Sequence, residues 1–260
     1  MKQDKIYILW TGGWDSTFML IQELRNGKVV QPVYIVDKDR RSLKYEKRAM
    51  QRIAEKLKKK NYGGILLPTE FIDRDVIPED KEVTEAYRIV YEKTGLGEQH
   101  EWIARYAKWK NVDLALGHEK GITASDRLTK TMKLYTKVEQ LEDGTFIINS
   151  EGSTDEGRAL LGRMIFPIMR YRETDMAKKV KEWEVEDVMK EIWFCHTPTR
   201  SGEACGFCHP CVVKMESGME FLLSDKAKRR YNYYVSHRKR GAIQRKIANA
   251  ILKVRLLFDW

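Results

Sequence analysis

The feature that most constrains the fold of this chain is an alternation of strand-like and helix-like segments over its first two thirds. Runs of β-branched and aromatic residues fit short buried strands, whereas apolar residues three or four positions apart fit one face of a helix. This order predicts an α/β fold, in which a Rossmann-like parallel sheet carries helices on both faces. We expect strands over 6–10, 33–36, 64–67, 112–116 and 163–169, and a polar loop over 150–157. We expect two helices over 42–60 and 99–110, and three more that begin at about Ser16, at an N-cap at Thr174 and at Val185.

Composition narrows the class of protein further. The 260 residues include 42% apolar and 33% charged residues, against about 25% charged residues in a typical chain, which excludes disorder and a collagen-like fibre. The charge of +10 makes the chain basic. No run of 18 apolar residues occurs, and the first residues lead into a strand-like segment without an apolar leader. We therefore expect a cytoplasmic protein that does not cross a membrane.

A glycine-rich segment, Thr11-Gly12-Gly13-Trp14-Asp15-Ser16-Thr17, separates the first expected strand from the first expected helix. We call residues 11–17 the glycine loop. Two glycines allow a tight turn and a close approach to an anion, and backbone N–H groups at the positive end of the helix face that anion. The order of residues differs from the G-x-x-x-x-G-K-[ST] loop, because no lysine follows the glycines. A strand-to-helix turn with no ligand remains the alternative.

All four cysteines, Cys195, Cys205, Cys208 and Cys211, lie within one short segment. Three of them are separated by two residues each, and four thiolates in such a segment can surround one tetrahedral Zn²⁺ with no open position. We therefore predict a structural zinc site. An iron–sulfur cluster and unliganded cysteines are the alternatives, and His196 and His209 are nearby spare ligands.

The glycine loop resembles the S-G-G-x-D-S signature of the PP-loop ATP pyrophosphatases, with Thr11 in place of the serine. Together with the cysteines, it makes residues 5–215 similar to the 7-cyano-7-deazaguanine synthase family, which has an adenine nucleotide alpha hydrolase-like fold. The resemblance implies ATP and Mg²⁺, with Asp15 orienting the Mg²⁺, and an acid that is adenylated, converted to an amide by ammonia and dehydrated to a nitrile. The catalytic residues implied are Asp15 and Ser16, and the ATP-binding residues are Trp10, Thr11, Gly12, Gly13, Trp14, Asp15, Ser16, Thr17, Asp37 and Gly117.

The sequence departs from that family where the acid would bind. A family stretch resembling D-Y-S-G-Y-P-D-C is replaced after Gly117 by residues 118–126, and Gly95-Leu96-Gly97-Glu98-Gln99 lacks the family's arginine. We expect an altered acid, either a small molecule or a modified polymer or protein. The candidate substrate-binding residues are His118, Glu119, Lys120, Arg170 and Arg172.

Beyond the cysteines, the chain is strongly basic. Eleven lysines and arginines against two aspartates are interleaved with tyrosines, and the part from Gly241 has the spacing of an amphipathic helix. Such a tail can pack on the rest of the chain or on a second subunit of a homodimer. Alternatively, it binds nucleic acid or a partner protein, and a membrane surface is the least favoured alternative. We expect an α/β domain over 1–194, the zinc segment over 195–223 and the helical tail over 224–260.

Three classes of function follow. The first is an ATP-dependent ligase of the 7-cyano-7-deazaguanine synthase type, which adenylates 7-carboxy-7-deazaguanine or a related small-molecule acid for reaction with ammonia or an amine. The second is an RNA-modifying amine ligase that adenylates a base while the basic tail holds the RNA; sulfur transfer is disfavoured because every cysteine belongs to the zinc segment. The third, a binding module without catalysis, conflicts with the full set of donors in the glycine loop.

Overall fold

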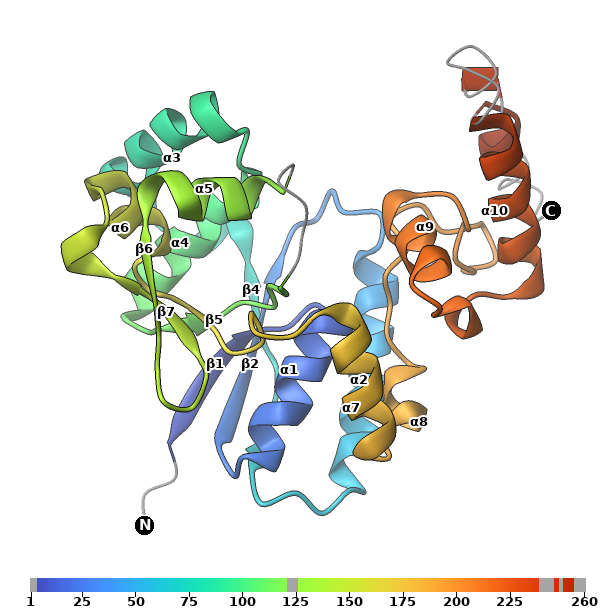
Figure 1. Ribbon diagram of the computed structural model, residues 1–260, viewed down its shortest axis with the longest axis horizontal. Helices are drawn as coiled ribbons and strands as arrows, with labels where there is room; N and C mark the ends of the chain where they lie inside the picture. Colours follow the sequence, from blue (N-terminus) through green and yellow to red (C-terminus); the bar gives the residue numbers. More distant parts are fainter. Residues whose placement is uncertain (1–3, 121–125, 239–245, 248–249, 255–260) are drawn as a thin grey trace. The chain divides into compact units, whose positions relative to one another are not determined.

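The computed structural model describes residues 4–120, 126–238, 246–247 and 250–254. It has a mixed α/β fold with a central, mainly parallel sheet (Figure 1). Its internal contacts divide the chain into two units. The first unit contains residues 1–11, 15–37 and 54–185, and the second contains residues 12–14, 38–53 and 186–260.

The sheet of the first unit has the strand order β3-β2-β1-β5-β8-β7-β6, and β4 also pairs with β2. All pairs among β1 to β5 and β8 are parallel, whereas β7 pairs antiparallel with β8 and with β6. The parallel sheet expected from the sequence is thus extended by a hairpin, whose strands need only a short turn between them. The strands are β1 (Lys5–Leu9), β2 (Val29–Val36), β3 (Ile65–Leu66), β4 (Glu70–Asp73), β5 (Leu114–Ala115), β6 (Lys137–Gln140), β7 (Phe146–Asn149) and β8 (Met164–Phe166).

Helices lie on both sides of this sheet, as Figure 1 shows, with α1 and α7 on one side and α3, α4 and α6 on the other. On the first side, Phe18 of α1 stacks on Trp183 with a centroid distance of 4.9 Å. On the second side, buried residues of α3, α4 and α6 form one apolar cluster with residues of β2, β5 and β8. The helices of the first unit are α1 (Trp14–Arg25), α3 (Lys81–Thr94), α4 (Gln99–Lys110), α5 (Arg127–Tyr135), α6 (Asp155–Leu161) and α7 (Glu173–Glu182).

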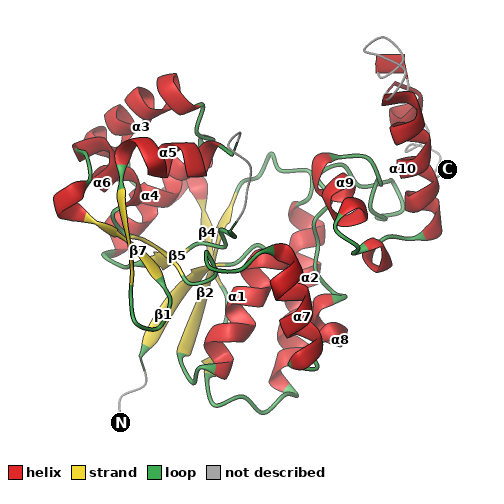
Figure 2. Cartoon of the chain, in the orientation of Figure 1, coloured by secondary structure: helices red, strands yellow, loops and turns green. Residues whose placement is uncertain are grey.

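The regular secondary structure in the described part of the second unit is helical. Helix α2 (Leu43–Lys58) begins in this unit and ends in the first, and it is followed much later by α8 (Glu186–Met189), α9 (His209–Glu216) and α10 (Asp225–Arg238). Figure 2 shows α9 and α10 side by side, and the chain between them includes a 3₁₀ turn at Glu220–Leu222. In the part of the chain that the structure describes, none of the helices combines the length and the apolar character that a membrane crossing requires.

Several expected boundaries were wrong for local reasons. Helix α1 begins two residues before Ser16, at Trp14, and β8 ends at Phe166, just before a proline. Thr174 does not cap α7; the helix begins at Glu173, and the carboxylate of Asp175 accepts a hydrogen bond from the N–H of Arg172. The expected polar loop over 150–157 is instead a 3₁₀ turn and the start of α6, with Thr154 as N-cap. Of the expected helix from Gly241, residues 246–247 and 250–254 are helical and the others lie outside the described residues.

Candidate functional site

The glycine loop connects β1 directly to α1 and is tied together by its own side chains. The N–H of Thr11 donates to Oγ of Ser16 at 3.3 Å, and the two hydroxyls lie 3.4 Å apart. The residues that flank this pair in the sequence are also linked, because the indole N–H of Trp10 donates to Oγ1 of Thr17 at 3.1 Å. These contacts fold the loop back over the first turn of α1, whose N–H groups have no partners within the helix. Such a turn can bind an anion.

Two glycines fit this turn closely. Gly12 has a φ of +70°, and a Cβ at this position would lie 3.0 Å from Cγ of Met50 on α2. Gly117 follows β5, and a Cβ there would lie 3.0 Å from the backbone nitrogen of Ser16 and 3.1 Å from Cβ of Asp15. The structure therefore brings Gly117 against the first turn of α1.

The turn residues 12–14 also contact the segment that contains the cysteines. The N–H of Trp193 donates to the carbonyl of Gly12 at 2.9 Å, and the ring of Trp193 stacks on Tyr45 at 4.7 Å. Trp14 is 3% exposed, and Nζ of Lys214 on α9 lies 5.0 Å from the centroid of its ring. Nothing in the sequence around the loop predicts these neighbours, since they are about 180 to 200 residues away along the chain.

Asp37 lies directly after β2, at the carboxyl end of the parallel strands. Its carboxylate is 3.4 Å from a guanidinium nitrogen of Arg74, which begins the 3₁₀ turn after β4. The parallel pairing of β2 with β4, with Val36 opposite Asp73, brings these two side chains together. Arg74 is therefore a charged group at this edge of the sheet that sequence reasoning missed.

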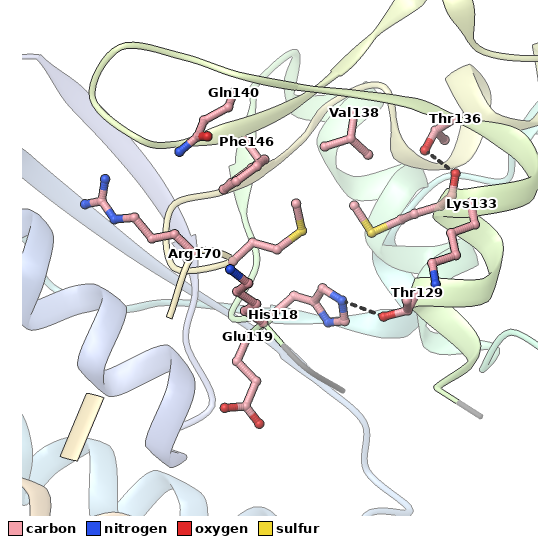
Figure 3. A pocket seen from close by; sticks show the side chains of 12 residues that line it. His118, Glu119, Thr129, Lys133, Thr136, Val138, Gln140, Phe146 and Arg170 are labelled. Atoms are coloured by element: carbon pink, nitrogen blue, oxygen red, sulfur yellow. Dashed lines mark hydrogen bonds between the residues drawn. The ribbon is translucent and has the colours of Figure 1, made fainter. Parts of the chain in front are cut away.

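A cavity of about 710 Å³ lies beside Gly117 in the first unit. Four of the five predicted substrate-binding residues line it, and Figure 3 labels three of them, His118, Glu119 and Arg170. The fifth, Arg172, is exposed at the start of α7 and does not line the cavity. The remaining lining comes from α5, the β6–β7 hairpin and Met169, and sequence reasoning connected neither α5 nor the hairpin to a site. The cavity is lined by His118, Glu119, Lys120, Thr129, Met132, Lys133, Thr136, Val138, Gln140, Phe146, Met169 and Arg170.

The lining has an apolar wall and a cationic rim. Methionine, valine and phenylalanine side chains form the wall, while three cations and one carboxylate contribute the charges. A guanidinium nitrogen of Arg170 donates to the carbonyl of Asp143 at 2.6 Å, which fixes the arginine at the hairpin turn. This combination suits an anionic ligand with an apolar body. The replacement segment predicted to form the binding region falls partly on residues 121–125, which lie outside the described residues.

His118 is the most buried polar residue of the cavity. Its Nε2 lies 3.1 Å from Oγ1 of Thr129 and 4.0 Å from the carboxylate of Asp126. Burial lowers the pKa of His118, against the opposing effect of Asp126, so the neutral ring is favoured. Burial likewise lowers the pKa of nearby His100, whose Nδ1 lies 3.0 Å from the carbonyl of Gly97.

The four cysteines come together as predicted. Their sulfurs all lie within 4.8 Å of one another, with separations such as 3.8 Å between Cys205 and Cys211 and 3.4 Å between Cys208 and Cys211. Four sulfurs in a tetrahedron around one Zn²⁺ would be about 3.8 Å apart, given Zn–S bonds of about 2.3 Å. The cluster, which we call the cysteine site, could therefore hold a metal ion such as zinc.

The surroundings of the cysteine site also suit bound thiolates. Backbone N–H groups of Phe207 and Cys208 donate to the sulfur of Cys205, and the N–H of Cys205 donates to the sulfur of Cys195. Hydrogen bonding among the cysteines, first of all with Cys195, lowers the pKa of Cys205 and lowers that of Cys208 to about 7, whereas it raises the pKa of Cys195 and Cys211. The spare ligands considered from the sequence, His196 and His209, are exposed and lie outside the sulfur cluster.

Helix α10 is part of the structure around the cysteine site. Arg230 is 3% exposed, and its guanidinium donates to the carbonyls of Ala204 and Cys205 at 3.0 and 2.9 Å. Gly206, with a φ of +87°, packs so closely that a side chain there would overlap the carbonyl of Ala227. Arg230 thus stabilises the fold of the cysteine segment, whereas Lys226 and Arg229 are exposed. Lys239, Arg240, Arg245 and Arg255 of the basic tail lie outside the described residues.

Comparison with known proteins gives little direct guidance. No protein-family model matches the chain, and no curated protein matches it. Among solved structures, it is similar to a predicted subunit of a tRNA methyltransferase from Methanocaldococcus jannaschii, with 14% sequence identity over 69% of this chain and 75% of that chain, and a TM-score of 0.35.

Proposed function

We propose that this protein is an ATP-dependent ligase of the 7-cyano-7-deazaguanine synthase type, which adenylates a carboxylate and releases pyrophosphate. The observation that carries the proposal is the glycine loop at the junction of β1 and α1, with Gly117 packed against the backbone of Asp15 and Ser16. Its place at the carboxyl end of a parallel strand is the usual place for a nucleotide in such a sheet. The adenylated acid would then react with ammonia or an amine, and the amide could be activated again and dehydrated to a nitrile.

In this proposal, the glycine loop contributes to the reaction by stabilising negative charge on the phosphates. Backbone N–H groups at the start of α1, with the hydroxyls of Thr11 and Ser16, would donate to the β- and γ-phosphates and stabilise the charge that develops on the leaving pyrophosphate. Asp15 would orient a Mg²⁺ ion, which supplies further neutralisation of the phosphate oxygens when bound. Asp37, fixed by Arg74, lies where the ribose and adenine would meet the edge of the sheet.

The cavity beside Gly117 is the place we propose for the acid. His118 lines the cavity and follows Gly117 directly, and Gly117 packs against the first turn of α1. Its volume of about 710 Å³ accommodates a small molecule, and the apolar wall would bury a ring while Lys133 or Arg170 pairs with a negative charge. The rebuilt lining supports an acid that differs from 7-carboxy-7-deazaguanine.

The cysteine site supports a resident structural metal. The sulfurs surround a single point at the spacing of one ion, which favours zinc over a cage of several irons. All four ligands come from the protein, which leaves no position for a reacting water. We therefore assign the metal to folding and give it no step in the reaction.

The proposal is tested by incubating the protein with ATP, Mg²⁺, ammonia and 7-carboxy-7-deazaguanine or related aromatic acids, and by mass spectrometry of the products. We expect AMP, pyrophosphate and an amide or nitrile of one of the acids. The exposed cations of α10, Lys226 and Arg229, favour one second candidate, the RNA-modifying amine ligase. AMP release that requires RNA and no free acid would support that candidate and contradict the first.

A further inference from the structure

One side chain in the cavity beside Gly117 is suited to accept a proton during a reaction. The lysines and the arginine of the lining are protonated at neutral pH, and a carboxylate such as that of Glu119 is a weaker base than an imidazole. His118 is the histidine of the lining, and it is 7% exposed. Because burial lowers the pKa of His118, its ring is neutral at pH 7, and one ring nitrogen keeps a lone pair that can accept a proton.

The neighbours of the His118 ring decide which nitrogen carries the proton. Nε2 lies 3.1 Å from Oγ1 of Thr129, a contact that Figure 3 draws as a dashed line, and 4.0 Å from the carboxylate of Asp126. A carboxylate on this side stabilises a proton on Nε2, which then donates to the hydroxyl of Thr129. Nδ1 is left as the acceptor, and it has no hydrogen-bond partner among the described residues.

Several elements of the first unit hold the ring in this orientation. Phe166 of β8 contacts it edge-on, with a centroid distance of 6.2 Å and an interplanar angle of 69°. Asp126, the N-cap of α5, accepts a hydrogen bond from the N–H of Thr129 at 2.6 Å, which fixes the two neighbours of Nε2 relative to each other. The N–H of Lys120 donates to the carbonyl of Tyr171 at 2.7 Å, so the segment after β5 is fixed to the segment after β8. A base that is oriented through its second nitrogen is a recurring arrangement in catalytic sites.

The position of His118 in the chain also suits a role in the reaction. It follows Gly117 directly, and a Cβ at Gly117 would lie 3.0 Å from the backbone nitrogen of Ser16 at the start of α1. Gly117, His118 and Ser16 all belong to the first unit, as the cavity does. Under the proposed function, the carbonyl carbon of the adenylated acid must lie between the cavity and the phosphates. His118 is the cavity residue that is joined directly to Gly117.

From this arrangement we propose that His118 is the general base for the attack of ammonia on the adenylated acid. This inference rests on the proposed function, because it assumes that the acid is adenylated. The lone pair of NH₃ forms the C–N bond, and an electron pair of the carbonyl group moves to its oxygen. Nδ1 of His118 takes one proton from the new ammonium nitrogen, the carbonyl group forms again, and AMP leaves with the electron pair of the broken C–O bond. Asp126 stabilises the imidazolium, which then releases its proton to water.

The two half-reactions separate this catalytic role from a structural one. Acid-dependent exchange of labelled pyrophosphate into ATP measures adenylation alone, whereas amide formation requires both steps. With 7-carboxy-7-deazaguanine, or with an aromatic acid that the wild type adenylates, His118→Gln should leave the exchange rate close to that of the wild type. Amide formation from ammonia should become slower by about 100-fold or more. His100→Gln is the matched control, because His100 lies in the same unit but outside the cavity lining, and both rates should equal those of the wild type.

A second nucleophile sharpens the test. Hydroxylamine is less basic than ammonia, so the nitrogen of its adduct is more acidic and loses its proton to water more readily. The difference in rate between His118→Gln and the wild type should therefore be smaller with hydroxylamine than with ammonia. A difference of the same size with both nucleophiles would contradict a role in proton transfer.

A measurement on the wild-type full chain decides the matter if His118→Gln does not fold. Nitrogen NMR of the histidine rings at pH 7 should show His118 as the neutral tautomer with its proton on Nε2. A proton on Nδ1, wild-type amide formation in a folded His118→Gln variant, or an equal loss of exchange and amide formation would overturn the inference alone. A wild-type protein without acid-dependent exchange would overturn the proposed function as well.

Discussion

The cavity beside Gly117 and the cysteine site differ in how completely their polar groups are used. In the cavity, cations, hydroxyls and apolar side chains surround about 710 Å³ of space. At the cysteine site, the sulfurs lie close to one another and accept hydrogen bonds from backbone N–H groups. Arg230 donates to the neighbouring carbonyls. The first arrangement suits an exchanging ligand and the second a permanent one. Changes at the cysteine site should therefore reduce stability first, and changes at the loop should reduce activity first.

The largest effect is expected from the cysteine site. Cys208→Ser removes one of four thiolates, so the metal should be lost, and the free energy of unfolding should fall by about 5 kcal/mol or more. Metal analysis and chemical denaturation measure the two quantities. His209→Ala, which changes an exposed neighbour, should retain about one metal per chain. Full metal content in the Cys208→Ser variant would remove the distinction between the two regions.

The second prediction compares the buried Arg230 with the exposed Arg229 in the basic tail. Arg230→Met leaves the carbonyls of Ala204 and Cys205 without their donor, which should lower the free energy of unfolding by about 2–4 kcal/mol. Arg229→Met changes the exposed neighbour and should stay within about 0.5 kcal/mol of the wild type. Equal effects in denaturant titrations would mean that Arg230 is an ordinary surface charge.

The third prediction concerns Gly12 and tests whether the glycine loop is needed for ATP turnover. Gly12→Ala forces a side chain into positive φ and against Met50, which should displace the loop and reduce ATP turnover by about 100-fold. Gly27→Ala is a matched control, because Gly27 has a φ of +79° but no atom within 4 Å of its added Cβ. Both variants should lose about 1 kcal/mol of stability from backbone strain. Turnover that is the same in both variants would separate the loop from the activity.

The smallest effect on stability is expected from His118. Its lowered pKa means that the unfolded chain takes up the proton first, so this residue's contribution to stability is present above about pH 6.5 and is lost as the pH falls below that value. His118→Gln should therefore flatten the decline in unfolding midpoint between pH 7 and pH 5. A parallel decline in the variant and the wild type would show that His118 is not held neutral by burial.

The local signals in the sequence were enough for the outline of the fold. Helix α4 was predicted over 99–110 and is confirmed with those bounds, and the cluster of four cysteines follows from their spacing. Helix α3 was missed although it carries readable signals, with Asp80 as N-cap and Gly95 as a left-handed C-cap. The antiparallel hairpin was missed because the short strand β6 is largely exposed and has no run of apolar residues.

The candidate site was less accessible to sequence reasoning. Arg170 was predicted from its position after a strand, and His118, Glu119 and Lys120 from the departure from the resembling family. All four line one cavity. The opposite wall comes from α5 and the hairpin, whose closeness to β5 is set by strand pairing across the sheet. Lys214 could not be predicted from spacing, because only the packing of α9 brings it to Trp14.

The most direct test of the whole account is where ATP is cut. ATP labelled at the α- and γ-phosphates should be converted by the wild-type protein, with an acid that it accepts, into labelled AMP and pyrophosphate, and Gly12→Ala should abolish most of that conversion. Release of ADP and phosphate would contradict the account, because the glycine loop is proposed to hold the β- and γ-phosphates together as one leaving group.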